Sequence, residues 1–115
     1  MKARLLRLPA PSRLLVRAFA AALAFTMIAG TAPQTHIVTI EGVQFSPQEL
    51  TVQRGDRVVW MNKDLFPHTA TASAKSFDSG NLLPNASWTY VARSPGEYAY
   101  ACTFHPTMQG KLIVR

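Results

Sequence analysis

The segment from Cys102 to Met108 carries three side chains that can bind a soft metal ion. A thiol, an imidazole and a thioether follow one another at intervals of three residues, in Cys102, His105 and Met108. On a helix these positions would share a face, but Pro106 lies among them, and a proline lacks an N–H donor and clashes with the preceding turn. A strand that ends at Cys102 and continues into a tight loop would instead bring the three side chains together. Donors of this kind form the set that favours copper.

The chain contains one cysteine and three histidines, which limits the sites that it can build. A lone cysteine forms no internal disulfide, so Cys102 is either a buried apolar residue or a sulfur that something binds. Blue-copper sites combine one cysteine with two histidines and a weak axial methionine. His36 is interpreted as a surface or edge residue of an alternating strand, whereas His68 stands directly before a threonine-rich strand and completes the set. We therefore predict a site for one copper ion, Cu(I) or Cu(II), made of His68, Cys102, His105 and Met108.

Residues 1–32 have the pattern of a secretory signal peptide, followed by a domain over 33–115. Residues 1–17 hold five of the twelve Lys and Arg residues and no acidic residue, and 18–32 is apolar or small throughout. This apolar segment is shorter than the roughly 20 residues of a membrane span, and if uncleaved it would act as an N-terminal tether. We predict a periplasmic or otherwise exported protein.

The charge of the chain belongs mainly to this leader. The whole chain carries a net charge of +6, but the seven basic and six acidic residues after position 32 leave only +1. The high net charge is therefore no support for nucleic-acid binding.

The rest of the chain predicts an all-β fold. Period-two alternation and turn signals indicate short strands, with no helical periodicity between them. We expect strands at 35–40, within 45–62 around a turn at 54–56, and at 68–73, 87–92, 97–102 and 111–115. Residues 76–85 hold either a short strand or a loop. Trp60 and Trp88 are expected in the core, and Tyr98 and Tyr100 on one face of their strand. Such a pattern is typical of a sandwich or barrel of about seven to eight strands.

Across residues 35–115 these motifs resemble the cupredoxins, the small blue copper proteins. The matching segments are FSPQELTVQRGDRVVWMNKD, PHTATA, FDSG, PGEYAYAC and CTFHPTMQGKLIV. The spacing C-x2-H-x2-M is similar to the short ligand loop of the amicyanin-type members. The resemblance implies an eight-stranded Greek-key β-sandwich with copper near one end. It also implies copper ligands at His68, Cys102 and His105, both histidines through Nδ1, with Met108 as the axial ligand.

One departure from the family pattern concerns the residue after the first ligand histidine. Many cupredoxins have an asparagine there that helps to tie the two ligand loops together. This chain has Thr69 at that position, and Thr103 after the cysteine. We expect these hydroxyls to form a similar link.

The sequence further predicts how such a site would be used. Four apolar residues flank the two ligand histidines and are interpreted as a docking surface for a redox partner: Phe66, Pro67, Phe104 and Pro106.

The predicted function is one-electron transfer by a monomer, without substrate turnover, because three histidines leave none for a further copper centre. The resemblance implies redox proteins as partners, such as a dehydrogenase as donor and a c-type cytochrome as acceptor. The alternatives are a copper-carrying or storage protein with the same ligands and a structural zinc domain. Met108 argues against zinc.

Overall fold

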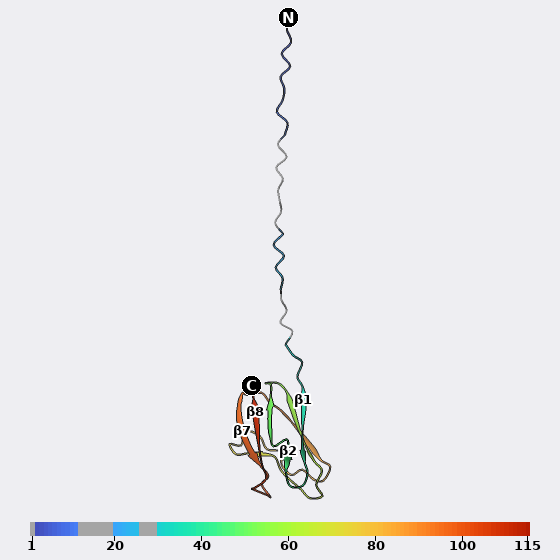
Figure 1. The fold of residues 1–115 in the computed structure, drawn as a ribbon, viewed down its shortest axis with the longest axis vertical. Helices are drawn as coiled ribbons and strands as arrows, with labels where there is room; N and C mark the ends of the chain where they lie inside the picture. The colour runs from blue at the N-terminus through green and yellow to red at the C-terminus, as the bar shows by residue number, and fades with distance from the viewer. Residues whose placement is uncertain (1, 12–19, 26–29) are drawn as a thin grey trace.

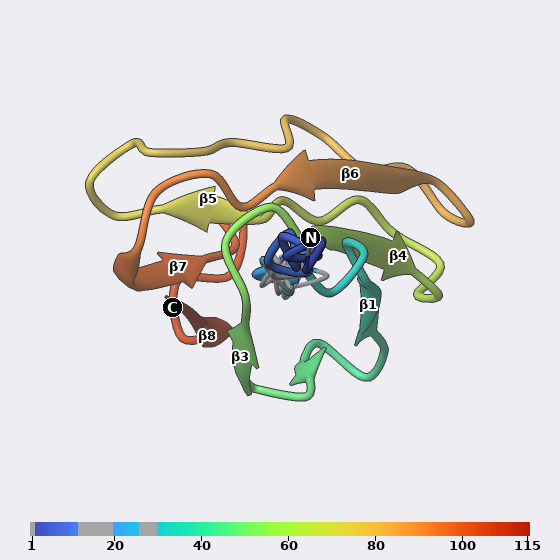
Figure 2. The ribbon, with the colours of Figure 1, turned by 90° about the horizontal axis from the view of Figure 1, so that it is seen from above.

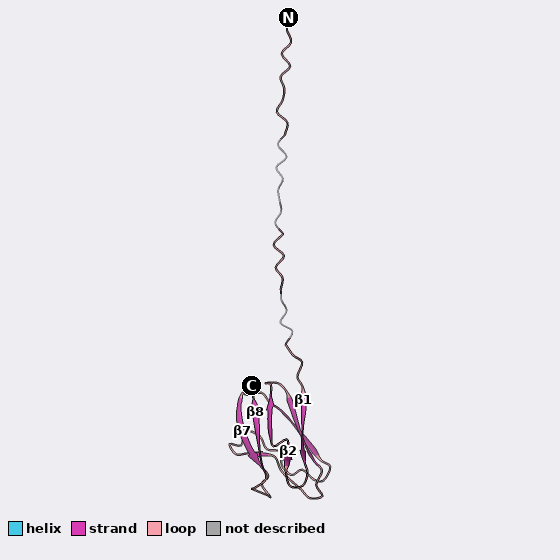
Figure 3. Ribbon diagram, in the orientation of Figure 1, coloured by secondary structure: helices cyan, strands magenta, loops and turns pink. Residues whose placement is uncertain are grey.

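The computed structural model describes residues 2–11, 20–25 and 30–115, and within these ranges it contains eight strands and no helix. The strands are β1 (Thr35–Ile40), β2 (Phe45–Ser46), β3 (Glu49–Val52), β4 (Arg57–Asn62), β5 (Thr71–Ala72), β6 (Ser87–Val91), β7 (Gly96–Ala101) and β8 (Gln109–Val114). The predicted all-β fold is confirmed (Figure 3).

The predicted signal peptide falls partly outside the described residues, at 1, 12–19 and 26–29. The described part of 1–32 has no helix or strand, its side chains are exposed, and it leads away from the sandwich (Figure 1). Over the described ranges, no helix is both long enough and apolar enough to cross a membrane. The leader and the domain boundary therefore stay predictions.

The strands form two four-stranded sheets that face each other (Figure 2). Sheet A has the order β2-β1-β4-β6, and sheet B has the order β3-β8-β7-β5. Strands β1 and β4 pair in parallel, as do β3 and β8, whereas the other neighbours are antiparallel. Because parallel neighbours need a crossover, the chain passes repeatedly from one sheet to the other around the ends of the sandwich. The loops that follow β4 and β7 carry the candidate site.

Aromatic side chains fill the space between the sheets. The ring of Trp60 is fully buried, and its centroid lies 5.3 to 5.6 Å from those of Phe77, Trp88 and Tyr100. Trp88 is partly buried against this cluster. Tyr98 and Tyr100 both pack on the inner side of β7. Trp60 lies in the core as predicted, whereas Trp88 packs against the core from a partly buried position; the predicted packing roles of both tyrosines are confirmed.

The predicted strand over 68–73 is wrong in its length. The strand is limited to the two residues of β5, and His68 forms an isolated bridge with Leu82 instead. Polar side chains compete with a strand ladder here, since the hydroxyl of Ser79 accepts the N–H of Ala70 at 2.8 Å. For the same reason 76–85 is a loop with two bridging residues and no strand of its own.

The predicted turn at 54–56 is present and is built around the carboxylate of Asp56. Its Oδ1 accepts the N–H of Gln34 at 3.0 Å, and its Oδ2 accepts the N–H of Gln53 at 3.0 Å and lies 2.9 Å from Nε2 of His36. Gly55 adopts the left-handed conformation that the turn requires, with φ of 95°. The bonds from Gln34, His36 and Gln53 lower the pKa of Asp56 from 3.8 to about 2. His36 is therefore a half-buried partner of this carboxylate and not a free surface residue.

We expect Asp56→Asn to reduce the free energy of unfolding at pH 7 and to lose that effect in acid. A carboxyl group whose pKa is depressed in the folded state stabilises the fold above its unfolded pKa of about 3.9, and this contribution is lost as the pH falls through the folded pKa. The difference between the two proteins should thus narrow between about pH 4 and about pH 2. Urea unfolding at several pH values measures this difference in unfolding free energy. A difference of the same size at pH 7 and pH 2 would contradict the prediction.

Candidate metal centre

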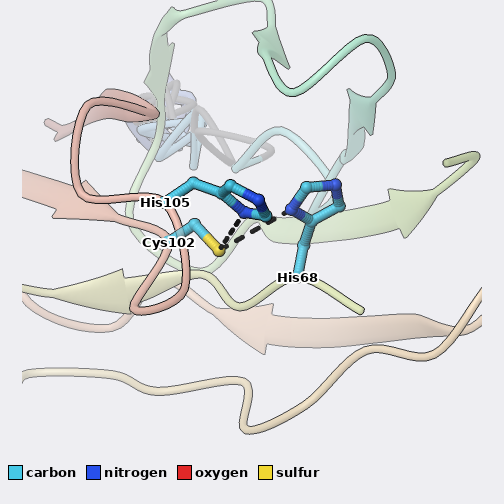
Figure 4. A group of neighbouring side chains, drawn as sticks. All are labelled: His68, Cys102 and His105. Carbon is cyan, nitrogen blue, oxygen red and sulfur yellow. Dashed lines mark hydrogen bonds between the residues drawn. The ribbon is translucent and has the colours of Figure 1, made fainter. Parts of the chain in front are cut away.

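Three donor atoms from the loops that follow β4 and β7 meet in one place (Figure 4). Sγ of Cys102 lies 3.6 Å from Nδ1 of His68 and 3.8 Å from Nδ1 of His105, and the three donors lie within 4.8 Å of one another. Metal bonds of about 2.0–2.3 Å to nitrogen and sulfur separate donors on one ion by about 3.5–3.7 Å. The spacing therefore fits a single metal ion. His68 and Cys102 are buried, and His105 is half-buried.

Both the backbone and the ring of His68 are held by hydrogen bonds. Its N–H donates to the carbonyl of Leu82 at 3.1 Å, and its carbonyl accepts the N–H of Leu82 at 2.8 Å. Its Nε2 lies 2.8 Å from Oδ2 of Asp64. Because a carboxylate accepts, Nε2 carries the proton, and the lone pair of Nδ1 faces Cys102. The ring thus presents Nδ1 as its donor atom, as the family resemblance implies.

Asn62, a fully buried residue at the end of β4, organises the loop that carries His68. Its amide donates to the carbonyls of Phe66 and Leu82, each at 2.9 Å, and its Oδ1 accepts the N–H of Asp64 at 2.9 Å. These bonds satisfy the amide and fix the curvature of the loop. Asn62 was not predicted as a site residue, and a single asparagine at a strand end is too common a signal to identify it.

Asp64 also helps to position His68, and the prediction from the sequence did not include it. Its carboxylate accepts the N–H groups of Gly42 at 2.7 Å and Val43 at 2.9 Å, besides its bond to His68. Burial raises the pKa of Asp64, but these three bonds outweigh burial and hold the pKa below its ordinary value. The only sequence signal was an acidic residue four positions before a candidate ligand.

A short loop between β7 and β8 carries the other predicted ligands. The N–H of Cys102 donates to the carbonyl of Met108 at 3.0 Å, and the N–H of Met108 donates to the carbonyl of His105 at 2.8 Å. Cys102 is 1% exposed and Met108 is 4% exposed. The segment 102–108 contains bends and a turn but no helix, in keeping with Pro106.

Thr69 joins the two loops through its side chain and its backbone. Its Oγ1 accepts the N–H of Thr103 at 2.9 Å and a bond from the hydroxyl of Thr71 at 2.9 Å. The two hydroxyl oxygens of Thr69 and Thr103 lie 3.2 Å apart. The N–H of Thr69 also donates to Sγ of Cys102 at 3.3 Å. This last bond fixes the position of the sulfur between the two loops.

We expect Thr69→Val to lower the free energy of unfolding of the metal-free protein by about 1–3 kcal/mol. The valine removes the acceptor for the N–H of Thr103 and leaves that partly buried donor unpaired. Denaturant unfolding measures the change. Thr107→Val is the matched control, since Thr107 is exposed and its hydroxyl makes no hydrogen bond within the described residues, and it should change stability by no more than about 0.5 kcal/mol. Equal losses in the two variants would contradict the role of Thr69.

Three of the four predicted docking residues gather around His105. A shallow pocket of about 300 Å³ is lined by Phe66, Pro67, Phe104 and His105. Phe66 and Phe104 are 42% and 51% exposed, which is unusual for large apolar side chains so close together. Pro106 instead lines a separate pocket and does not share this one. Leu65, which is 90% exposed, is an apolar neighbour of Phe66 in the chain that the prediction omitted.

Comparison with known proteins agrees with this geometry. The family model described as a cupredoxin-like domain matches residues 14–114. The chain belongs to the cupredoxin-like family. Amicyanin-alpha of Methylorubrum extorquens is 31% identical to this cupredoxin over 82 residues, which cover 67% of this chain and 69% of the relative. Plastocyanin of a Synechococcus species is 31% identical over 102 residues, which cover 72% of this chain and 75% of the relative.

Solved structures show the same fold. The oxidised state of an amicyanin variant with alanine in place of a proline has a TM-score of 0.67 to this cupredoxin at 28% identity. The match covers 70% of this chain and 82% of that one. A copper-containing nitrite reductase from Thermus scotoductus has a TM-score of 0.66 at 27% identity, but the match covers 22% of that chain.

Copper is the metal that this comparison supports. A solved amicyanin variant with alanine in place of a methionine is in a Cu(I) form. Cupredoxins bind copper, and the His, Cys, His and Met cluster of this cupredoxin can bind a single copper ion. This cupredoxin spans 63% of the length of the amicyanins of Paracoccus versutus and Paracoccus denitrificans.

Proposed function

We propose that this cupredoxin carries single electrons between redox proteins through one copper ion, which His68, Cys102, His105 and Met108 would hold. The observation that supports this most strongly is the convergence of one sulfur and two Nδ1 atoms at 3.6 and 3.8 Å. When bound, copper supplies the one-electron chemistry by alternating between Cu(I) and Cu(II).

The chain's own groups hold the donors in one arrangement. The backbone of His68 is bonded to Leu82 and its ring to Asp64, so the ring has little freedom to turn. The N–H of Thr69 donates to the sulfur of Cys102 and holds it in place. Since these bonds come from strand ends and from tied loops, they hold the donor atoms of His68 and Cys102 in place before an ion binds. Donors that are positioned in advance are suited to electron transfer.

Two other functions use similar donors and are less well supported. A copper-carrying or storage protein would share the ligands, but it would exchange its metal readily, whereas Cys102 is 1% exposed and fixed by bonds on both sides. A structural zinc domain would not need the buried thioether of Met108, which is not among the usual zinc ligands. The chain's three histidines also provide no second centre of the kind that a copper enzyme would need.

The location and partners of the protein form part of the same proposal. The basic and then apolar leader of 1–32 supports export to the periplasm ahead of a domain at 33–115. The apolar pocket beside His105 supports brief docking of a redox protein, because weak electron-transfer encounters use small interfaces of less than about 1,200 Å². A dehydrogenase as donor and a c-type cytochrome as acceptor are the kinds of partner that we propose for a monomer.

Titration of the metal-free full chain with Cu(II), followed by visible absorption and electron spin resonance, tests the proposed function. We expect an intense blue charge-transfer band that is complete at one equivalent and is bleached reversibly by ascorbate. A parallel Zn(II) titration provides the colourless reference. A weakly coloured Cu(II) complex would show that Cys102 is not a copper ligand and would contradict electron transfer.

We expect Phe104→Glu to slow electron exchange between two copies of the copper-loaded protein by about tenfold or more. The substitution places like charges opposite each other at the pocket, and such a juxtaposition costs several kcal/mol. Nuclear magnetic resonance line broadening in mixtures of the oxidised and reduced protein measures the rate. Ile37→Glu is the control, because Ile37 is 56% exposed and does not line the pocket. A comparable decrease with Ile37→Glu would reject the pocket as the docking surface.

A further inference from the structure

We infer that the carboxylate of Asp64 positions the ligand ring of His68 by binding it to the turn between β1 and β2. The inference rests on the proposed function in so far as His68 binds copper. Asp64 is 10% exposed at its side chain and accepts three hydrogen bonds: one from the ring of His68 at 2.8 Å and two from the backbone of the turn. It is thus a positioning residue that acts through His68.

The turn that Asp64 binds has an unfavourable backbone. Gly42 and Val43 have φ values of 62° and 58°, and the N–H of Glu41 donates to the carbonyl of Gln44 at 3.1 Å across them. A left-handed φ is ordinary for glycine but is an outlier for a β-branched residue such as valine. Such conformations persist where the surroundings impose them. The two N–H groups of this turn converge on the oxygens of Asp64, so the carboxylate accounts for the strained conformation.

The same carboxylate determines which nitrogen of His68 is available. A carboxylate bonded to the outer nitrogen of a ligand histidine fixes the tautomer and the ring orientation, and makes the ligand more basic. Here it keeps the proton on Nε2 and turns Nδ1 towards Sγ of Cys102. Through Asp64, the copper ligand is therefore attached to a turn more than twenty residues earlier in the chain.

The molecule contains a matched carboxylate that serves as an internal control. Asp56 precedes β4 and Asp64 follows it, and each accepts two backbone N–H groups and one Nε2 of a histidine. The histidine that Asp56 binds is His36, which is not part of the metal cluster. Loss of Asp56 should therefore reproduce the structural cost of losing such a carboxylate, without the effect on the metal site.

The test compares Asp64→Asn with Asp56→Asn in the full chain. In the metal-free protein, long-range proton–nitrogen correlation should place the His68 proton on Nε2 in the wild type and in Asp56→Asn, and partly on Nδ1 in Asp64→Asn. In the loaded protein, Asp64→Asn should weaken Cu(II) binding by about 10–100-fold. It should weaken Cu(I) binding less. Because each tenfold change in the ratio of the Cu(I) and Cu(II) affinities changes the reduction potential by 59 mV, the potential should rise by up to about 60–120 mV. Asp56→Asn should leave both properties unchanged.

An unchanged tautomer in Asp64→Asn would overturn the inference, as would an equal loss of copper affinity in Asp56→Asn. Because the tautomer is read without metal, a protein that fails to form the blue centre would disprove the proposed function and still test Asp64. Val43→Gly relaxes the turn and should raise the unfolding temperature less in Asp64→Asn than in the wild type, because without the carboxylate the turn is no longer held in the conformation that strains valine. If Asp64→Asn alone does not fold, the double variant provides the tautomer measurement. An equal gain in both backgrounds would refute the link between the turn and Asp64.

Discussion

Cys102→Ser is expected to abolish the intense visible band of the Cu(II) protein completely. The band requires a sulfur-to-copper charge transfer, and Cys102 is the chain's single cysteine. Its Sγ lies 3.6 and 3.8 Å from the Nδ1 atoms of His68 and His105, so no other residue replaces it without rebuilding the site. The loss of Cu(II) affinity should exceed the 10–100-fold that removal of an outer partner costs.

The same substitution should leave the fold of the metal-free protein intact. A serine hydroxyl is smaller than a thiol, but it can still accept the N–H of Thr69, which now donates to the sulfur at 3.3 Å. Unfolding of the metal-free variant should therefore resemble that of the wild type within about 1–2 kcal/mol. Visible titration gives the first result and denaturant unfolding the second. A serine variant that still turned blue would remove Cys102 from the ligand set.

Gly110→Ala is expected to destabilise the protein strongly, because the added methyl group would overpack the space between β8 and the ring of Tyr100. Tyr100 and Gly110 are register partners on β7 and β8, and the ring of Tyr100 lies directly over the glycine. A Cβ at position 110 would lie 2.5 Å from the hydroxyl oxygen of Tyr100 and closer still to its ring carbon Cζ. The ring cannot move aside easily, because Tyr100 is 2% exposed and packs against Phe45 and Trp60.

The expected cost is about 3 kcal/mol, at the upper end for overpacking, and this corresponds to a fall in Tm of more than about 12 °C for a domain of this size. Calorimetry or thermal unfolding measures it. Gly80→Ala is the control, since its Cβ would meet no atom within 4 Å, and only the cost of its φ of 63° applies, about 1–2 kcal/mol. In a Tyr100→Leu background, Gly110→Ala should cost less, because the shorter side chain lacks the clashing atoms. The same cost in both backgrounds would exclude the clash as the cause.

Local patterns in the sequence predicted most of the strands but misjudged the segment that begins at His68, the first predicted ligand. Strands with strict alternation, such as 35–40 and 97–102, agree with β1 and β7 to within a residue or so. The threonine-rich segment 68–73 has the propensity to form a strand, but most of it does not pair with a neighbouring strand. Its backbone is instead hydrogen-bonded by Ser79 and Leu82, which lie in a loop. Propensity describes a residue's preference for a pleated surface and does not identify its hydrogen-bonding partner.

The predicted docking residues show the same limit. Phe66, Pro67 and Phe104 were recognisable as neighbours of the predicted ligands in the chain, and three-dimensional packing brings them to one pocket. Pro106 had an equal claim from its position, yet it lines another pocket. Chain proximity to a ligand leaves open which side of the loop a residue occupies.

The sequence by itself determined the donor types, because one cysteine, three histidines and a C-x2-H-x2-M loop after a strand allow few arrangements other than a copper site. Only the tertiary structure decided how that site is held. Asp64 meets the ring of His68 and the turn at Gly42 and Val43 because the end of β4 lies beside the end of β1 in sheet A. Thr69 meets Thr103 because the loops after β4 and β7 approach each other across the end of the sandwich. The bonds of Asp64 to the turn and of Thr103 to Thr69 join residues that are more than twenty positions apart. The pairing of strands that creates them depends on the whole packed core rather than on any local segment.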